Sequence, residues 1–146
     1  MERKQAQSHQ LLIGGVLLFL LGLLVAFGIP MMANSRMGLS AHLEGTMNGM
    51  FLMLLGLIWH KIQLSEKGLT ATYWLTVYGS FANFTAVTIA AITGAGKMMP
   101  LAGGQEGGTI VEGLISFLLI SLALCMVAAC VLVLVGLVRH AKQAKP

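Results

Sequence analysis

Charged residues are scarce in this sequence. Lys, Arg, Asp and Glu together make up 10% of its 146 residues, while hydrophobic residues make up 57%. A soluble globular domain carries about 25% charged residues, so this composition excludes one and is typical of an integral membrane protein. The formal net charge is only +4, which membrane topology and anionic lipid explain without a nucleic-acid partner.

The sequence also lacks the motifs of several common classes of enzyme and metal site. The only cysteines, Cys125 and Cys130, point to different sides of a predicted helix and therefore do not indicate a redox pair. The sequence has no serine–histidine–acid arrangement, no phosphate-binding loop and no clustered Cys/His metal motif. These absences argue against a hydrolase, a nucleotide-binding domain and a zinc site.

Four apolar stretches are long enough to cross a bilayer, for which roughly 20 residues are needed. They lie at about 11–33, 39–63, 70–95 and 108–138. The sequence thus predicts an all-α fold, an integral membrane four-helix bundle with residues 1–146 in a single domain. The first stretch is too long for a signal peptide and is expected to remain in the protein.

The distribution of basic residues predicts the orientation of the bundle. Seven lie on the side that holds both termini, namely Arg3, Lys4, Lys61, Lys67, Arg139, Lys142 and Lys145. Two lie on the opposite side, namely Arg36 and Lys97. Because basic residues concentrate on the cytoplasmic side, both termini are expected in the cytoplasm.

The most unusual stretch is Met37–Phe51, near the start of the second predicted helix. At about 100° per residue, Gly45 and Gly49 lie on the same side of the helix as His42. Glycine destabilises helices, so a glycine-rich face needs a reason. One reason is close packing against another helix, which is common in membranes. The other is room for a flat macrocyclic cofactor held by His42.

Polar residues of the second and third predicted helices mark further candidates. Glu44 lies about 200° around the helix from His42, so the two residues cannot share a target through this helix alone. An acidic residue inside a membrane is a functional candidate by default, and the role of Glu44 stays open. Asn83 is expected to face protein or a cavity, whereas Tyr78 lies about 140° away from it and faces a different neighbour.

An isolated intramembrane histidine suits haem chemistry, because a neutral imidazole is a good axial ligand for iron. His9, His60 and His140 are predicted at the cytoplasmic ends of their helices, and His60 is roughly 27 Å from His42. A haem on His42 therefore keeps one open iron position, unless a methionine closes it. An open position suits a reacting ligand, and a closed one suits an electron carrier.

Three features lie at the outer side of the predicted bundle. Arg36 is a candidate partner for a lipid headgroup or for a carboxylate of a buried cofactor. Ser40 is expected to cap the first turn of the second helix. Residues Gly94–Gly108 form a glycine-rich loop that is either a lid over a pocket or a flexible connection.

The run Arg36–Met50, followed by Gly56–Trp59, closely resembles the hydroxylaminobenzene mutases, and Tyr78–Asn83 fits the same family. These are small four-helix bacterial membrane proteins that convert arylhydroxylamines to aminophenols. The resemblance extends over most of the chain. It implies the same fold, an isomerase activity and a location in the bacterial inner membrane.

A looser resemblance connects the chain to the styrene oxide isomerases, through His42 followed six residues later by Asn48-Gly-Met50. In that family the histidine holds haem b between the protomers of a trimer, and the ferric iron acts as a Lewis acid on the epoxide oxygen. The resemblance implies that His42 is the axial ligand and that Asn48 positions the reacting oxygen. The chain departs from the family at Tyr78, where an aspartate is usual, and at Ala86–Val87, where a tyrosine is missing.

Together these patterns predict a membrane isomerase that uses haem b to rearrange arylhydroxylamines to 2-aminophenols. The alternatives are an epoxide isomerase, a non-enzymatic haem protein (electron carrier or sensor), and a small-solute exporter or structural protein. The expected partners are a small apolar aromatic substrate, membrane lipid and further copies of the chain in a homotrimer with haem between protomers. The predicted catalytic residues are Asn48, Tyr78 and Asn83, and the predicted cofactor-binding residues are His42 (also the metal ligand), Gly45, Gly49 and Arg36.

Overall fold

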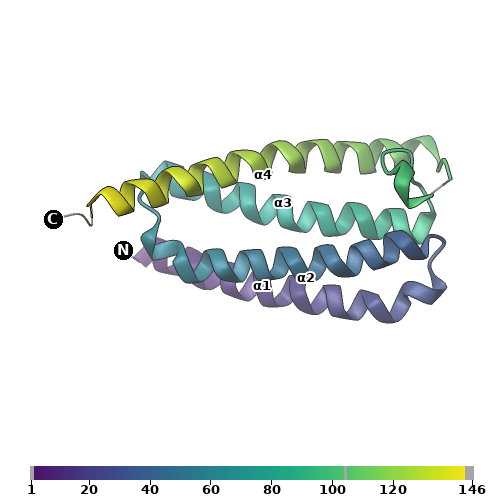
Figure 1. Cartoon of the computed structure of the whole chain (residues 1–146), viewed down its shortest axis with the longest axis horizontal. Coiled ribbons are helices and arrows are strands. Elements are labelled where there is room, and N and C mark those ends of the chain that lie inside the picture. The colour runs from purple at the N-terminus through teal and green to yellow at the C-terminus, as the bar shows by residue number, and fades with distance from the viewer. Residues whose placement is uncertain (1, 104, 144–146) are drawn as a thin grey trace.

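The chain folds into four long helices (Figure 1). The computed structural model describes residues 2–103 and 105–143, with α1 at Glu2–Gly28, α2 at Ser35–Ile58, α3 at Glu66–Thr93 and α4 at Thr109–Gln143. All four are long and apolar enough to cross a membrane. Within this described part of the chain the only β pairing is an isolated bridge between Ala95 and Gln105. The predicted all-α four-helix fold is confirmed.

The helices form two antiparallel pairs, α1 with α2 and α3 with α4, and the start of α1 and the end of α4 lie at the same end of the bundle (Figure 1). We call this end of the bundle, which also carries residues 59–65, the terminal end. The opposite end, which carries residues 29–34 and 94–108, is the loop end. The cytoplasmic location of the termini stays a prediction, and Lys145, one of the basic residues behind it, lies outside the described residues.

The first three helices begin earlier than the hydrophobic pattern predicts, whereas α4 begins within one residue of the predicted start. The α1 helix starts at Glu2 because its polar first turns continue beyond the apolar segment that hydropathy detects. The α2 helix starts at Ser35, because the Asn34 side chain accepts hydrogen bonds from the backbone N–H groups of Arg36 and Met37. The prediction that Ser40 caps this helix was wrong: Ser40 lies inside α2, where its hydroxyl donates to the Arg36 carbonyl at 3.1 Å.

Glycines bring α1 and α2 into backbone contact. A Cβ atom placed on Gly45 would lie 2.5 Å from the Gly22 Cα, and one on Gly49 would lie 2.6 Å from the Phe19 nitrogen. The α1 helix therefore fills the glycine-rich face of α2. Gly45 and Gly49 thus supply close helix packing, the first of the two reasons for a glycine-rich face, while their part in binding a cofactor stays a prediction.

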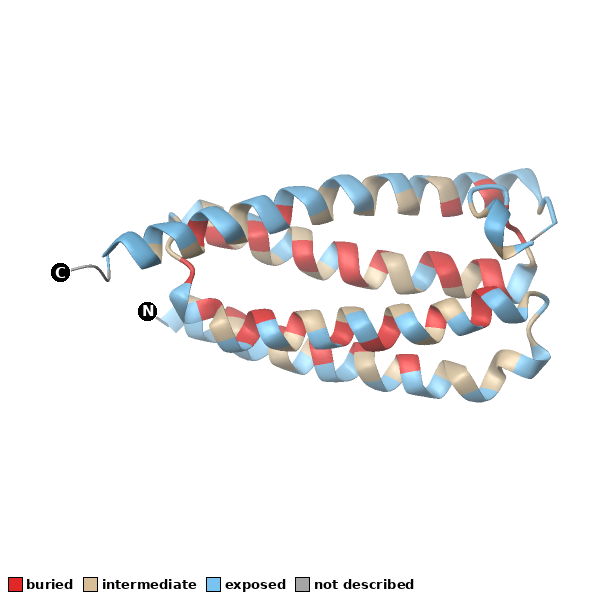
Figure 2. Cartoon of the chain, viewed as in Figure 1, coloured by how far each residue is buried: buried red, intermediate tan, exposed pale blue. Residues whose placement is uncertain are grey.

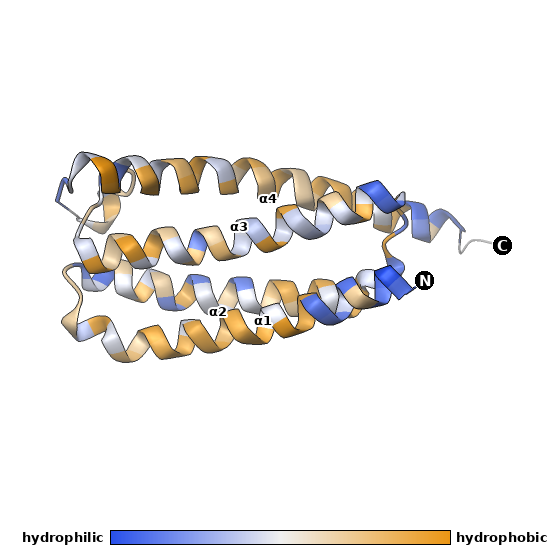
Figure 3. Ribbon diagram, turned by 180° about the vertical axis from the view of Figure 1, so that it is seen from behind, coloured by the Kyte–Doolittle hydropathy of each residue, from blue (hydrophilic) through white to orange (hydrophobic). Residues whose placement is uncertain are grey.

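The interior of the bundle is built around two apolar clusters, shown as buried residues in Figure 2. At the terminal end, Trp59 is fully buried and its indole N–H donates to the Gln7 side chain at 3.3 Å. At the loop end, small residues of α3 such as Ala90 and Ala91 pack against Met37 and Ile115. Hydrophobic residues predominate in the middle of the helices, while hydrophilic residues are concentrated at the terminal end (Figure 3). This pattern matches a bundle that lies in lipid.

Replacing Gly45 with Ala should destabilise the bundle. The new methyl group meets the Gly22 backbone, which has no rotamer to change, so α1 and α2 must separate. We expect a loss of about 1–3 kcal/mol in the free energy of unfolding, measured as a lower melting temperature by circular dichroism in detergent.

Gly113→Ala is the matched control, because Gly113 lies within α4 and nothing lies within 4 Å of its added Cβ. In this variant the higher helix propensity of alanine should leave stability unchanged or raise it by about 1 kcal/mol. A Gly45→Ala protein that melts at or above the wild-type temperature would contradict the backbone contact.

Candidate active site

Three polar side chains meet between α2 and α3. The Glu44 Oε2 atom accepts a hydrogen bond from Asn83 Nδ2 at 2.6 Å and another from Asn48 Nδ2 at 3.0 Å. All three residues are partly buried. The structure thus joins two predicted catalytic residues, Asn48 and Asn83, through the glutamate whose role the sequence left open.

The geometry of this cluster follows from helix periodicity and from the chemistry of carboxylates. Glu44 and Asn48 are one helical turn apart and therefore share a face of α2. Asn83 approaches from α3, as expected for a residue that faces protein. Because a carboxylate only accepts hydrogen bonds, both asparagines present Nδ2 to it, and their Oδ1 atoms remain available as acceptors. Such charge-assisted bonds are stronger than neutral ones.

A cavity of about 580 Å³ lies on the loop-end side of this cluster. Glu44 and Asn83 form its inner wall, and Arg36 and Ser40 provide the other polar groups. The remaining lining is mostly apolar and comprises Met37, Val87, Met98, Met99, Pro100, Leu101, Ala102 and Leu119. This combination of apolar walls and a few convergent polar groups is typical of a site for a small organic ligand.

The glycine-rich loop covers this cavity. Its residues 98–102 form part of the lining, which agrees with the interpretation of the loop as a lid. Glu112 of α4 anchors the loop, because its Oε1 accepts from the backbone N–H groups of Gly107 at 2.8 Å and Lys97 at 3.4 Å. The loop is therefore held to the bundle on the α4 side.

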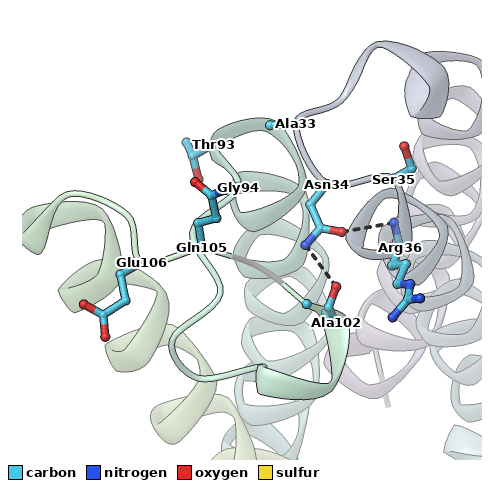
Figure 4. Close-up of a pocket in the computed structure, with 10 residues that line it drawn as sticks. Ala33, Asn34, Ser35, Arg36, Thr93, Gly94, Ala102, Gln105 and Glu106 are labelled. Carbon is cyan, nitrogen blue, oxygen red and sulfur yellow. Dashed lines mark hydrogen bonds between the residues drawn. The ribbon is translucent and has the colours of Figure 1, made fainter.

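Asn34 holds the loop from the other side of the bundle. Its Nδ2 donates to the Ala102 carbonyl at 3.3 Å, and its backbone N–H donates to the Ala91 carbonyl at 3.0 Å. Figure 4 shows Asn34 between the first turn of α2 and the loop, beside an open hollow of about 630 Å³. Arg36 and Ala102 line both this hollow and the cavity. The hydropathy pattern, which places the start of this helix at 39, gives no sign of this role, whereas Asn34 itself is a residue type that commonly caps helices.

His42 points away from the cavity, toward α1. Its Nδ1 lies 2.9 Å from the Gly22 carbonyl oxygen, which can only accept, so Nδ1 carries the proton. The lone pair of Nε2 is then free, and Nε2 has no partner among residues 2–103 and 105–143. Metal-bound histidines commonly donate their other N–H to a backbone carbonyl in this way, so His42 suits an axial ligand.

Two other predicted residues are not part of the cluster. The Tyr78 hydroxyl lies 2.6 Å from the Ser121 hydroxyl, where α3 meets α4, and Tyr78 lines a separate apolar pocket with Trp74 and Phe81. The structure therefore does not bring the predicted catalytic Tyr78 together with Asn48 and Asn83. Arg36 borders the cavity, about 120° around α2 from His42.

No group of three or more metal-ligating side chains occurs in the described parts of the chain, whereas a haem needs only one protein ligand.

A family model described as styrene oxide isomerase matches residues 7–138. The chain belongs to the styrene oxide isomerase family. The match includes the whole of α2 and α3 and most of α1 and α4. It therefore contains the Glu44 cluster, His42 and the loop over the cavity.

This member of the styrene oxide isomerase family is also similar to two mutases from Ectopseudomonas oleovorans. Hydroxylaminobenzene mutase HabB is 52% identical over 132 residues, which cover 89% of this chain and 80% of HabB. Hydroxylaminobenzene mutase HabA is 42% identical over 127 residues, which cover 86% of this chain and 94% of HabA. No solved structure was found to match the chain.

These relatives confirm the resemblance drawn from the sequence. The chain is an isomerase of the mutase type, which removes the non-enzymatic alternatives. Its four membrane-capable helices and its family also make it a multi-pass membrane protein.

Replacing Asn83 with Ala removes the shorter hydrogen bond to Glu44 and leaves that carboxylate with one amide donor. We expect a loss of about 1.5–3 kcal/mol in the free energy of unfolding, because hydrogen bonds to charged groups contribute this much. In a Glu44→Ala background the same change should cost much less, since the carboxylate is gone. Denaturant unfolding in mixed micelles measures both values.

Ser121→Ala is the control for this cycle, because it removes a hydrogen bond between two uncharged groups, Tyr78 and Ser121. Its expected cost is about 1 kcal/mol or less. Equal costs for Asn83→Ala in the wild-type and Glu44→Ala backgrounds would contradict the coupling between Asn83 and Glu44.

Proposed function

We propose that this protein rearranges arylhydroxylamines to 2-aminophenols within the bacterial cell membrane, with both termini in the cytoplasm. The observation that carries the proposal is the Glu44 cluster at the wall of an apolar cavity of about 580 Å³. The similarity to HabA and HabB, whose names include hydroxylaminobenzene, supports the substrate class. Apolar aromatic substrates partition into lipid, which suits a cavity at membrane depth.

The proposed reaction is an isomerisation and consumes no second reactant. The N–O bond of the substrate breaks, and a C–O bond forms at the ortho carbon of the ring. The ortho carbon loses one proton and the nitrogen gains one, so atoms and electrons balance within the molecule. A site that binds no nucleotide or redox co-substrate is sufficient for such a reaction.

The cavity residues perform three tasks in this proposal. Apolar side chains such as Met37, Val87 and Leu119 surround the aromatic ring and exclude water. Asn83 and Glu44 orient the polar end of the substrate. Asn48, which bonds to Glu44, holds the carboxylate in position. Charge that develops during N–O cleavage is stabilised most effectively in such a water-poor environment.

We further propose that His42 holds haem b through Nε2. The hydrogen bond from Nδ1 to Gly22 supports this role, whereas the filled glycine face requires the macrocycle to lie outside the α1–α2 contact. When bound, the haem iron supplies a Lewis acid that weakens the N–O bond. His42 and Glu44 lie on nearly opposite faces of α2, so a reaction that uses both needs more than one copy of the chain. The homotrimer with haem between protomers, implied by the family resemblance, meets this requirement.

Epoxide isomerisation is the second candidate activity, and the match to the styrene oxide isomerase model favours it. The cavity accommodates an aromatic epoxide as well as an arylhydroxylamine by size and apolar lining. The two activities therefore need to be compared directly.

Purified protein should convert phenylhydroxylamine to 2-aminophenol under anaerobic conditions without an added reductant. With styrene oxide assayed in parallel, we expect kcat/KM to be higher for phenylhydroxylamine by about tenfold or more. Chromatographic detection of both products measures the ratio. Turnover of styrene oxide alone would replace the proposed substrate class with epoxides.

His42→Ala should abolish the Soret absorption of protein produced in haem-replete cells, because Nε2 of His42 is the proposed axial ligand. His60→Ala is the control, since His60 is exposed at the terminal end and should leave the spectrum unchanged. Asn48→Ala should keep the Soret band and lower kcat by about tenfold, through loss of one hydrogen bond to Glu44. A wild-type protein without a Soret band would remove haem from the proposal.

A further inference from the structure

The inner wall of the cavity carries two acceptor oxygens that no residue of the described chain bonds, one on Glu44 and one on Asn83. Glu44 Oε2 receives the amide groups of Asn48 and Asn83. Glu44 Oε1 has no hydrogen-bond partner among residues 2–103 and 105–143, and Glu44 lines the cavity. The carboxylate thus has one oxygen fixed by the protein and one oxygen available to a ligand.

The neighbouring Asn83 also has an acceptor oxygen without a partner. Asn83 also lines the cavity, and its Nδ2 is already committed to Glu44 at 2.6 Å. One of the two Nδ2 hydrogens is used in this bond, and the Asn83 Oδ1, which can only accept, has no hydrogen-bond partner among residues 2–103 and 105–143. Both residues that form this wall therefore offer an unpaired acceptor oxygen. The Ser40 hydroxyl already donates to the Arg36 carbonyl, and the Arg36 guanidinium belongs to an earlier turn of α2, toward the loop end.

This polarity discriminates between the two substrate classes. An arylhydroxylamine carries N–H and O–H donors that match the wall, whereas an epoxide carries only an acceptor oxygen. A site that is built to pair with a polar group rejects analogues without it far more strongly than a purely apolar pocket does. A bare acceptor facing an epoxide oxygen loses its solvation and gains no hydrogen bond in return.

Resting on the proposed function, we propose that Glu44 is the specificity-determining residue of this enzyme: its free carboxylate oxygen, beside Asn83, binds the N–H group of the substrate and excludes epoxides. Asn48 acts as a positioning residue, because its bond to Oε2 keeps Oε1 directed to the ligand. The apolar lining accepts the aromatic ring of either class, so selection depends on this polar wall.

The substitution Glu44→Gln tests this role with little change of shape. The glutamine carbonyl oxygen continues to accept from Asn48 and Asn83, and its NH₂ group then takes the place of the free oxygen. A donor now faces the N–H of an arylhydroxylamine and suits an epoxide oxygen. The probes are 2-aminophenol, the stable product with an N–H donor, and styrene oxide, measured by anaerobic titration calorimetry of the detergent-solubilised full chain.

We expect Glu44→Gln to weaken binding of 2-aminophenol by about 10- to 100-fold, as for the loss of a hydrogen bond to a charged group. Binding of styrene oxide should stay within about threefold of wild type or become tighter, as for loss of the acceptor that faces it. Glu44→Asp keeps an acceptor-only carboxylate and should retain the preference for 2-aminophenol. Equal weakening of both probes, unchanged affinity for 2-aminophenol, or loss of the preference in Glu44→Asp would each overturn the assignment.

Glu112→Gln is the matched control, because it changes another buried glutamate at the loop end that lies outside the cavity lining. Its carbonyl oxygen can keep the bonds from Gly107 and Lys97, so both affinities should match wild type. Turnover is assayed separately on the same preparations. A wild type that binds 2-aminophenol without converting phenylhydroxylamine contradicts the proposed function, while the affinity ratios still decide the role of Glu44.

Discussion

The close contact between α1 and α2 is the constraint on which the rest of the structure depends. Gly22 meets Gly45, and Gly49 meets the α1 backbone near Phe19, at distances that leave no room for a single methyl group. Such a contact fixes both the spacing and the rotation of α2, because any side chain larger than hydrogen would separate the helices. The glycine face turns toward α1, and the polar residues of α2 are then distributed by helix geometry.

That distribution separates two chemical functions on one helix. His42 lies beside the glycine face and donates to the Gly22 carbonyl, so its remaining nitrogen is free for a ligand. Glu44 lies nearly opposite and meets Asn83 of α3. A carboxylate in an apolar bundle is costly unless hydrogen-bonded, and two amide donors stabilise Oε2 while Oε1 has no partner among residues 2–103 and 105–143. The same bonds that stabilise the fold therefore give the cavity its polarity.

Much of this architecture was predictable from local pattern. Four apolar stretches predicted the four helices, and the separation of His42 from Glu44 followed from the helical repeat. Asn83 was expected to face protein, because its side chain does not readily bond to its own helix. The helix starts were less predictable, since hydropathy detects the lipid-embedded part of a helix and not its polar first turns. The motif around His42 also led to the correct family.

The sequence by itself thus determined a membrane-embedded, all-α isomerase, because composition, periodicity and a long motif are local properties. Only the tertiary structure decided that α1 packs on Gly45 and Gly49, and that Glu44 joins Asn48 to Asn83. It also placed residues 98–102 over the cavity. These features depend on the relative rotation and register of helices far apart in the chain. Backbone contact and hydrogen bonding between helices set that register, and neither is encoded in any single segment.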